Sequence, residues 1–343
     1  MDVVGLPLGL AVLLTLAFTP VAKRLAVRVG AYDRPVARSV HARPMPHLGG
    51  LAMFAAFALT VVARGTGGRE MWGILLGGAA MVALGIVDDF RGIHPAAKLA
   101  GQVAVALLTV WFGVRIEWIT NPLGGMWYAG AYSIPLTVLW MIIVINTVNV
   151  VDGLDGLAAG ICSIASLTLL FVALRAGQAH VVTLTAALAG CALGFLPYNF
   201  NPAKIFMGDA GSMFLGYALA AISVEGTLKS ATTVALLIPV LALGLPLFDV
   251  SFAVVRRLLN GRPIYQADRE HLHHRLLELG LTQRQVALVM YGVSGCLGLG
   301  AVLIGGGNAR LGLVIVAMVV VLSLVVASRL GLLQIRPNRL GRH

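Results

Sequence analysis

The chain has 343 residues, of which 59% are hydrophobic and only 11% are charged, and its formal net charge is +11. A soluble globular domain has about 45–50% apolar and about 25% charged residues, so this composition excludes an ordinary soluble protein. The apolar runs are continuous, which also excludes a membrane β-barrel built from alternating segments. We therefore expect an all-α, polytopic membrane protein.

Eleven apolar runs of membrane-spanning length follow one another along the chain. They cover roughly residues 3–22, 48–63, 71–87, 98–114, 133–150, 157–174, 181–197, 211–226, 232–255, 285–305 and 310–328. We expect one bundle of about eleven transmembrane helices and a single domain, residues 1–343. Pro246 lies inside the ninth run and lacks a backbone N–H, so we expect that helix to be bent or broken.

The basic residues divide unevenly between the two sets of connectors. The segments that follow the odd-numbered spans contain 19 of the 25 lysines and arginines. The positive-inside rule places these segments in the cytoplasm, with the N-terminus outside and the C-terminus in the cytoplasm. Topology and attraction to anionic lipid headgroups thus explain the excess charge, and we expect no nucleic-acid partner.

The acidic residues gather on the same side as the basic ones. The acids that lie there include Asp88, Asp89, Asp152, Asp155, Asp209, Asp268 and Glu270. The short connectors of the outer side have only Glu70, Glu117 and Glu225 near them. One-sided clustering predicts a single site in a cleft at the cytoplasmic membrane surface.

Asp88 and Asp89 follow the third span directly. A helix C-terminus disfavours anions and adjacent like charges repel, so a bound cation would remove both penalties. A solvated helix end is the simpler alternative. Asp209, standing alone, would be explained as the N-cap of the eighth span, although a helix N-terminus beside a metal-held carboxylate also suits a phosphate.

The stretch NTVNVVDGLDGLA places four polar side chains three residues apart, so that neighbours lie roughly on one helix face. These are Asn146, Asn149, Asp152 and Asp155. The pattern fits either a polar seam between helices or a row of ligands for a polar substrate or a cation. Separated carboxylates without a cysteine partner favour Mg²⁺ or Mn²⁺ over zinc.

Two further segments add cationic donors. The stretch HLHHRLLELG supplies His271, His273, His274 and Arg275 as phosphate donors, with a solvated basic loop or a zinc site as alternatives. The stretch RPVARSVHARPMPHLGG contains Arg43, which either guides an anionic substrate or lies at the membrane surface. Asp249, an acid inside the ninth predicted span, either holds the bend near Pro246 or serves the site.

Acids, cationic donors and a lipid boundary together suggest chemistry between a soluble anionic substrate and a membrane lipid. Phosphoryl transfer fits because it needs positioning, a metal and charge neutralisation more than a covalent nucleophile. A secondary transporter is the rival class, but its acids would lie near the bilayer midplane between internal repeats.

Five stretches resemble, in order, the polyprenyl-phosphate N-acetylhexosamine-1-phosphate transferase family. They are VDD followed by Lys98, NTVNVVDGLDGLAAG, NFNPAKIFMGDAGSMFLG, PLFDV and DREHLHHRLLELG, and they extend from about Asp33 to about Gly280. The resemblance implies a phosphotransferase of the bacterial inner (cytoplasmic) membrane. Such an enzyme would move a sugar-1-phosphate from a UDP-sugar to undecaprenyl phosphate and release UMP, with Mg²⁺ at the cytoplasmic face.

The resemblance also implies roles for individual residues. Asp209 would be a Mg²⁺ ligand with Asp152 near the metal, and Asp88 and Asp89 would flank the lipid phosphate as catalytic residues. A phosphate monoester is already mostly deprotonated near pH 7, so whether Asp88 is a base or a positioning group stays open. The implied substrate contacts, with Phe206 stacking on uracil, are Lys98, Asn149, Asp155, Asn199, Phe206, His273, His274 and Arg275, and we add His271 as a candidate.

The order His-Leu-His-His-Arg and the eleventh span with its basic tail resemble the branch that uses UDP-N-acetylglucosamine (UDP-GlcNAc). That branch starts envelope glycans such as O-antigen or teichoic acid. Another UDP-N-acetylhexosamine or UDP-MurNAc-pentapeptide is the alternative donor. The resemblance also allows a homodimer.

Overall fold

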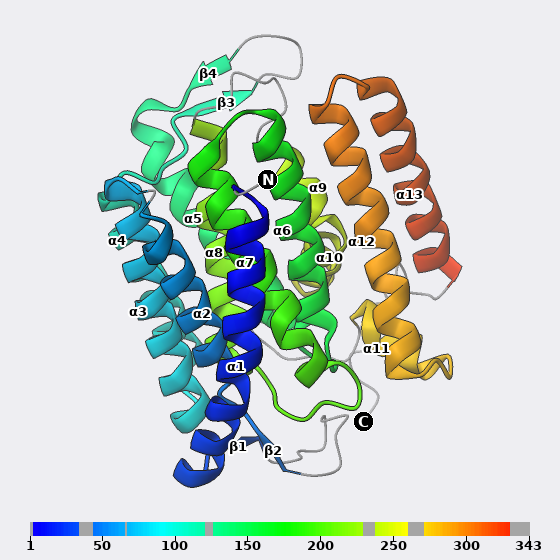
Figure 1. Ribbon diagram of the computed structural model, residues 1–343. Coiled ribbons are helices and arrows are strands. Elements are labelled where there is room, and N and C mark those ends of the chain that lie inside the picture. Colours follow the sequence, from blue (N-terminus) through cyan, green and yellow to red (C-terminus); the bar gives the residue numbers. More distant parts are fainter. Residues whose placement is uncertain are drawn as a thin grey trace.

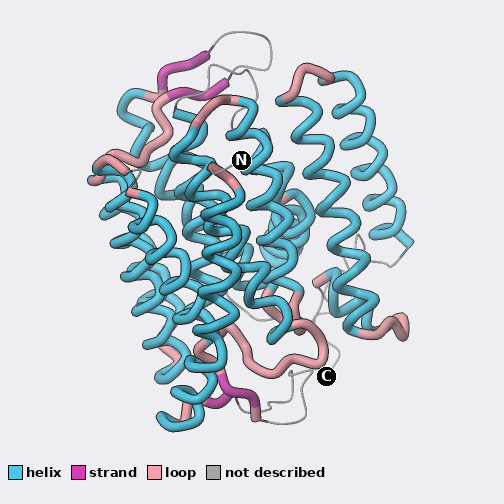
Figure 2. Tube along the Cα trace, viewed as in Figure 1, coloured by secondary structure: helices cyan, strands magenta, loops and turns pink. Residues whose placement is uncertain are grey.

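The computed structural model describes residues 3–33, 44–65, 67–120, 126–228, 237–259 and 271–329. Within these ranges the chain is almost entirely helical, which confirms the all-α prediction (Figures 1 and 2). Each of the eleven predicted spans overlaps helix. The helices concerned are α1 (Gly5–Val29), α2 (Gly49–Arg64), α3 (Arg69–Arg91), α4 (Pro95–Trp111), α5 (Ser133–Val151), α6 (Leu157–Arg175), α7 (Ala179–Asn199), α8 (Gly208–Leu228), α9 (Leu237–Ala242) with α10 (Gly244–Leu259), α12 (Gln283–Gly305) and α13 (Ala309–Arg329).

Several short elements were not predicted. They are α11 (Leu272–Glu278), the 3₁₀ turn η1 (Gly130–Tyr132), the antiparallel pair β1 (Tyr32–Asp33) and β2 (Met45–Pro46), and the antiparallel pair β3 (Trp118–Thr120) and β4 (Met126–Tyr128). The two strand pairs lie at opposite ends of the bundle (Figure 1). We call the end with β1, β2 and the 200–207 loop the site end.

The hydropathy of the helices supports a multi-pass membrane protein. Within the described ranges, six segments are long and apolar enough to cross a membrane: Gly5–Val29, Arg69–Arg91, Gly130–Val151, Leu157–Arg175, Ala179–Asn199 and Gln283–Gly305. Three shorter apolar helices, Gly49–Arg64, Pro95–Trp111 and Ala309–Val325, accompany them.

The ninth predicted span is broken, as Pro246 suggested. Helix α9 ends at Ala242 and α10 begins at Gly244, so Pro246 lies in the first turn of α10. A first-turn N–H has no partner within its own helix, and proline is therefore tolerated there.

Glycines let the helices that carry the site approach closely. A Cβ added to Gly85 of α3 would lie 2.3 Å from the Cα of Ala210 in α8. A Cβ added to Gly50 of α2 would lie 2.2 Å from the backbone nitrogen of Gly211. Helices α2, α3 and α8 therefore converge backbone to backbone at the site end, and this brings the end of α3 against the start of α8.

Candidate active site

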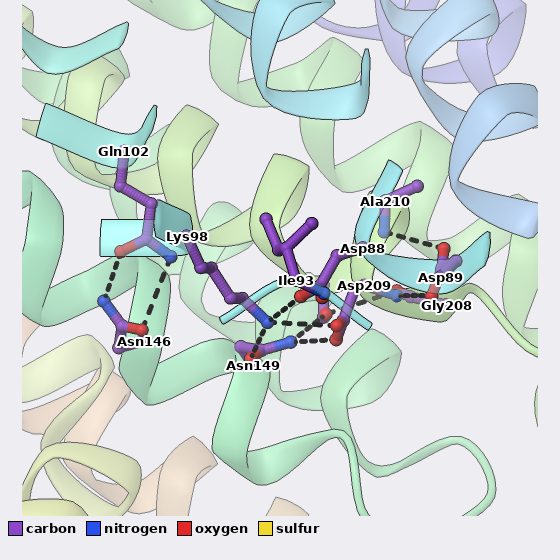
Figure 3. Close-up of polar contacts among 11 residues, drawn as sticks. Asp88, Asp89, Ile93, Lys98, Gln102, Asn146, Asn149, Gly208, Asp209 and Ala210 are labelled. Atoms are coloured by element: carbon purple, nitrogen blue, oxygen red, sulfur yellow. Dashed lines mark hydrogen bonds and ion pairs between the residues drawn. The ribbon is translucent and has the colours of Figure 1, made fainter. Parts of the chain in front are cut away.

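Lys98, in the first turn of α4, lies at the centre of a polar cluster at the site end (Figure 3). Its ammonium group forms an ion pair with Asp88 Oδ2 at 2.8 Å and donates to Asp209 Oδ2 at 3.0 Å and Asn149 Oδ1 at 3.1 Å. The Asn149 amide in turn donates to Asp209 Oδ1 at 2.6 Å. The structure thus brings four predicted residues together from the ends of α3, α4, α5 and α8. We call these four residues the Lys98 cluster.

A short turn between α3 and α4 sets this geometry. Asp88 accepts the Ile93 N–H on Oδ1 at 3.0 Å, and its backbone carbonyl accepts the Gly92 N–H at 2.7 Å. His94 then caps α4, accepting the Ala96 N–H on Nδ1 at 3.3 Å. The turn therefore reverses the chain within a few residues, so that Lys98 returns to Asp88.

Asp89 binds the N-terminus of α8, whereas Asp88 binds Lys98 of α4. Its carboxylate accepts the backbone N–H groups of Asp209, at 2.8 Å, and Ala210, at 3.3 Å, so it caps α8 from outside that helix. Gly208 permits the approach, because its φ is +70° and a Cβ there would lie 2.6 Å from Asp89 Oδ2. The explanation of Asp209 as only an N-cap is therefore wrong: Asp89 performs that function, and the Asp209 carboxylate turns to Lys98 and Asn149.

The same contacts revise the argument that the adjacent acids need a bound cation. Lys98 neutralises Asp88, and the N-terminus of α8, which favours an anion, accommodates Asp89. Each acid therefore has a partner within the protein, so a bound cation is not the only way to offset these penalties. A metal beside this pair stays a prediction.

The turn after α5 presents one carboxylate that no described residue binds. Asp152 ends α5, and no hydrogen bond to its side chain is made within the described ranges. Burial, followed by the neighbouring carboxylates of Asp209 and Asp89, raises the pKa of Asp152 well above its usual range. Asp152 therefore has a free carboxyl group beside the Lys98 cluster.

Asp155 and Asn199, by contrast, brace the loop that leads to α8. Asp155 Oδ2 accepts the Asn201 side-chain amide and the Ala203 N–H, both at 2.9 Å. Asn199 accepts the Gly156 N–H at 3.1 Å and donates to the Ile205 carbonyl at 3.2 Å. These bonds fasten the 200–207 loop to the turn after α5, and a direct contact of either side chain with substrate stays a prediction.

Helix α11 packs its histidines against this turn. His271 Nδ1 lies 3.1 Å from Asp249 Oδ2, and the Leu272 N–H donates to Asp249 Oδ1 at 3.0 Å, so Asp249 anchors the start of α11. His273 is 1% exposed, and its Nε2 would lie 2.9 Å from a Cβ added to Gly153. Gly153 therefore allows the imidazole to reach the turn after α5.

The remaining side chains of α11 lie around His273. The rings of His271 and His273 are stacked with centroids 5.8 Å apart, and the His274 ring centroid is 4.4 Å from that of His273. Arg275 donates to Glu278 at 3.0 Å, while its Nε is buried without a partner among the described residues. Burial, and then His274, lower the pKa of His273 to about 3. His273 is therefore a neutral imidazole at physiological pH.

Two other predicted residues lie differently. Phe206 fastens the 200–207 loop to β2 and α2, because its N–H donates to the Pro46 carbonyl at 2.9 Å and its carbonyl accepts the Gly49 N–H at 3.0 Å. Stacking of its ring on uracil stays a prediction. Arg43 lies outside the described residues, as do Asp268 and Glu270.

Sequence reasoning missed some members of the site. Gln102, one turn after Lys98, exchanges two hydrogen bonds with Asn146, at 2.7 and 3.4 Å. Ser212 accepts from the Asn149 amide at 2.9 Å. The matched spacings Lys98/Gln102 on α4 and Asn146/Asn149 on α5 are the signal that could have found the amide pair. His47 is 6% exposed, and neither ring nitrogen has a hydrogen-bond partner in the described part of the chain.

The carboxylates of the site could hold a divalent cation such as Mg²⁺ only if substrate phosphates supplied further ligands. No group of three or more His, Cys, Asp or Glu side chains positioned to hold a metal occurs among the residues that the structure describes. Mg²⁺ in proteins is commonly held by one or two carboxylates, with substrate phosphates and water completing its shell. Asp209, whose side chain is 33% exposed, and the free Asp152 carboxyl group fit that requirement.

Comparisons with known proteins place the chain in a family. Residues 71–227 match the model of glycosyl transferase family 4, a range that contains the whole Lys98 cluster. The chain is 38% identical over 324 residues to a probable undecaprenyl-phosphate N-acetylglucosaminyl 1-phosphate transferase of Bacillus subtilis, which covers 94% of this chain and 90% of the relative.

Two further relatives extend the comparison. A decaprenyl-phosphate N-acetylglucosaminephosphotransferase of Mycobacterium tuberculosis is 36% identical over 322 residues, covering 85% of this chain and 80% of the relative. A phospho-N-acetylmuramoyl-pentapeptide-transferase of Moorella thermoacetica is 34% identical over 219 residues, covering 59% of this chain and 66% of the relative. These similarities identify a membrane enzyme that is a transferase and replace the transporter hypothesis. The chain belongs to the polyprenyl-phosphate N-acetylhexosamine-1-phosphate transferase family.

Proposed function

We propose that this enzyme transfers N-acetylglucosamine-1-phosphate from UDP-GlcNAc to undecaprenyl phosphate, giving undecaprenyl-diphosphate-GlcNAc and UMP. The observation that carries the proposal is the Lys98 cluster, in which one ammonium, two carboxylates and an amide converge at one end of the bundle. The two relatives matched over most of this chain are named for N-acetylglucosamine, which supports a GlcNAc donor over a MurNAc-pentapeptide donor. The product would begin the membrane stage of a cell-envelope glycan.

The site end would face the cytoplasm of a bacterial inner membrane. The asymmetry of Lys and Arg between the connectors supports this orientation, with about eleven spans in a single domain. The nucleotide sugar would then arrive from water, while the acceptor lipid keeps its polyprenyl tail in the bilayer. Leaving that tail in lipid retains about 0.8 kcal/mol of transfer free energy per CH₂ group. The reacting phosphates can meet only at the membrane surface.

The reaction would be an in-line phosphoryl transfer. An oxygen of the lipid phosphate attacks the phosphorus that bears the sugar, and the bond from that phosphorus to the oxygen of UMP breaks. Mg²⁺, held by Asp209 with Asp152 near it, would neutralise charge on the diphosphate when bound. Lys98 and the α11 donors would orient the phosphates, and Asp88 would position Lys98. The neutral His273 would donate or accept a hydrogen bond without carrying charge.

A donor panel tests the proposal. Purified enzyme in detergent would receive undecaprenyl phosphate and radiolabelled UDP-GlcNAc, UDP-GalNAc or UDP-MurNAc-pentapeptide, with Mg²⁺ or with EDTA. We expect labelled lipid with UDP-GlcNAc and Mg²⁺, and none with EDTA. Turnover with only another donor would refute the donor assignment, and absence of turnover with every donor in folded protein would refute the proposed reaction.

A further inference from the structure

The ammonium of Lys98 has no donor left for a substrate in the arrangement that the structure shows. A lysine ammonium has three N–H groups and no acceptor. Its three partners, at 2.8, 3.0 and 3.1 Å, are Asp88, Asp209 and Asn149 (Figure 3). Lys98 can therefore bind a phosphate only after it leaves at least one of these partners.

The position that Lys98 occupies is also one that suits a divalent cation. Asp209 Oδ2 and Asp88 Oδ2 each lie within 3.0 Å of the ammonium nitrogen, and carboxylate oxygens are the ligands that Mg²⁺ prefers. A metal that took Asp209 Oδ2 as a ligand would face the positive charge of Lys98 across one shared oxygen. Two cations at that separation repel strongly in a partly buried site. One of them must move.

Lys98 is the group that can move. Its charge is carried on a flexible four-carbon stem, so the ammonium group can change partners without movement of helix α4. Asp209 and Asp88 are fixed more firmly. Their helices meet where Asp89 caps α8 and where Gly85 contacts Ala210.

We propose that Lys98 is an internal counter-cation that a divalent metal displaces, and that the displaced ammonium then becomes a phosphate donor. This inference depends on the proposed function, because it takes Asp209 as the metal ligand. Metal and phosphate would therefore bind cooperatively. The metal makes the ammonium available, and a phosphate that holds the ammonium away from Asp209 favours the metal.

The test measures metal binding without turnover. Free Mn²⁺ would be followed by electron paramagnetic resonance while it is titrated into purified enzyme in detergent. The proteins would be wild type, Lys98→Met, Lys98→Gln and the matched control Lys204→Met. Lys204 is an exposed lysine of the 200–207 loop at the same end. We expect both Lys98 variants to bind Mn²⁺ at least about tenfold more tightly than wild type, with Lys204→Met unchanged.

The second readout is coupling to a phosphate ligand. In wild type and Lys204→Met, saturating Mn²⁺ should tighten UMP binding, and in the Lys98 variants that coupling should largely disappear. Unchanged or weaker Mn²⁺ binding in folded Lys98 variants would overturn the inference. Tighter Mn²⁺ binding in the Lys98 variants, with the coupling between Mn²⁺ and UMP intact, would also overturn it. Such a result would mean only that removal of a nearby positive charge favours the metal. Absence of Mn²⁺ binding in wild type would refute the metal site itself. Mg²⁺-dependent turnover and Mn²⁺ binding by wild type, with Mn²⁺ affinity unchanged in the Lys98 variants, would refute only the inference.

Discussion

At the scale of single residues, the side chain of Asn149 contacts both the Lys98 ammonium and the Asp209 carboxylate. Its side chain accepts from Lys98 and donates to Asp209, so it sets the distance between the cation and the carboxylate. An amide is suited to this place because it supplies a donor and an acceptor without adding charge. The sequence pattern indicated a polar row here, but the specific partners come from helices distant in sequence.

Asn149→Ala should therefore lower the rate of transfer by about 100-fold, because small misplacements of reacting groups have effects of that order. The rate constant of labelled-lipid formation at saturating substrates measures this. The matched control is Asn308→Ala, an exposed asparagine between α12 and α13. An Asn149→Ala enzyme as active as the control would show that the cluster does not position the reacting groups.

His273 gives a prediction for the pH dependence of stability. In the folded protein burial depresses its pKa to about 3, so the unfolded state, with an ordinary value near 6.5, binds more protons between these values. Stability is therefore complete above about pH 6.5 and falls as the pH decreases, by about 2 kcal/mol at pH 5. Thermal unfolding should show a smaller loss between pH 7 and pH 5 in His273→Gln than in wild type. Equal losses would contradict the buried, neutral state of this imidazole.

At the scale of elements, the site depends on the contact between the end of α3 and the start of α8. Asp89 supplies the cap that α8 lacks in its own sequence, and Gly208 makes room for it. This long-range cap could not be predicted from local sequence, because Asp89 and Asp209 are far apart along the chain. Gly208, directly before Asp209, is the one local sequence feature that is associated with this cap.

Gly208→Ala should destabilise the protein and disrupt the site. The added methyl group meets both a backbone with φ of +70° and the Asp89 carboxylate. We expect a loss of about 2 kcal/mol or more in the free energy of unfolding and a large loss of activity. Gly177→Ala is the matched control, because Gly177 has φ of +69° and nothing within 4 Å of the added Cβ. If the two variants lose equal stability and activity, the Asp89 contact is without effect.

The elements show how far the sequence could predict the fold. Apolar run lengths predicted the positions of the long described helices to within several residues, since backbone groups in lipid must be paired within a helix. The number that crosses the membrane stays a prediction. The break beside Pro246 was also predicted. The short helix α11 and the two small strand pairs were not, because elements of a few residues have no periodicity and form through contacts made elsewhere. The sequence separation between Asp88 and Lys98 likewise did not indicate that the chain reverses between them and brings the two side chains together.

The whole molecule has two unlike ends, which supports a fixed orientation in the membrane. The end opposite the site exposes the aromatic side chains of Trp118, Trp127, Tyr128 and Tyr132, which suit a membrane–water interface. The site end carries the charged side chains of the Lys98 cluster. The placement of the acidic residues predicted one polar end of the bundle, and its orientation toward the cytoplasm stays a prediction. The contacts inside the Lys98 cluster needed the three-dimensional structure.

Cysteine labelling tests the orientation. Cys162 and Cys191 are buried and Cys296 is exposed, so a Cys296→Ser background should label weakly. We expect a membrane-impermeant maleimide to label Tyr132→Cys in intact cells. Lys204→Cys, at the site end, should react only after the inner membrane is opened. The reverse pattern would place the site outside the cytoplasm.

We infer that the Lys98 cluster, with Asp209 as its metal-binding carboxylate, performs transfer to the lipid. The most direct measurement compares Asp209→Asn with Glu117→Gln in the labelled-lipid assay with UDP-GlcNAc and Mg²⁺. Glu117 is a matched carboxylate paired with Arg115 at 2.8 Å, next to β3 at the other end of the bundle. We expect a loss of about 100-fold or more for Asp209→Asn, and a rate within about twofold of wild type for Glu117→Gln. Transfer by Asp209→Asn at the wild-type rate would contradict this role of Asp209.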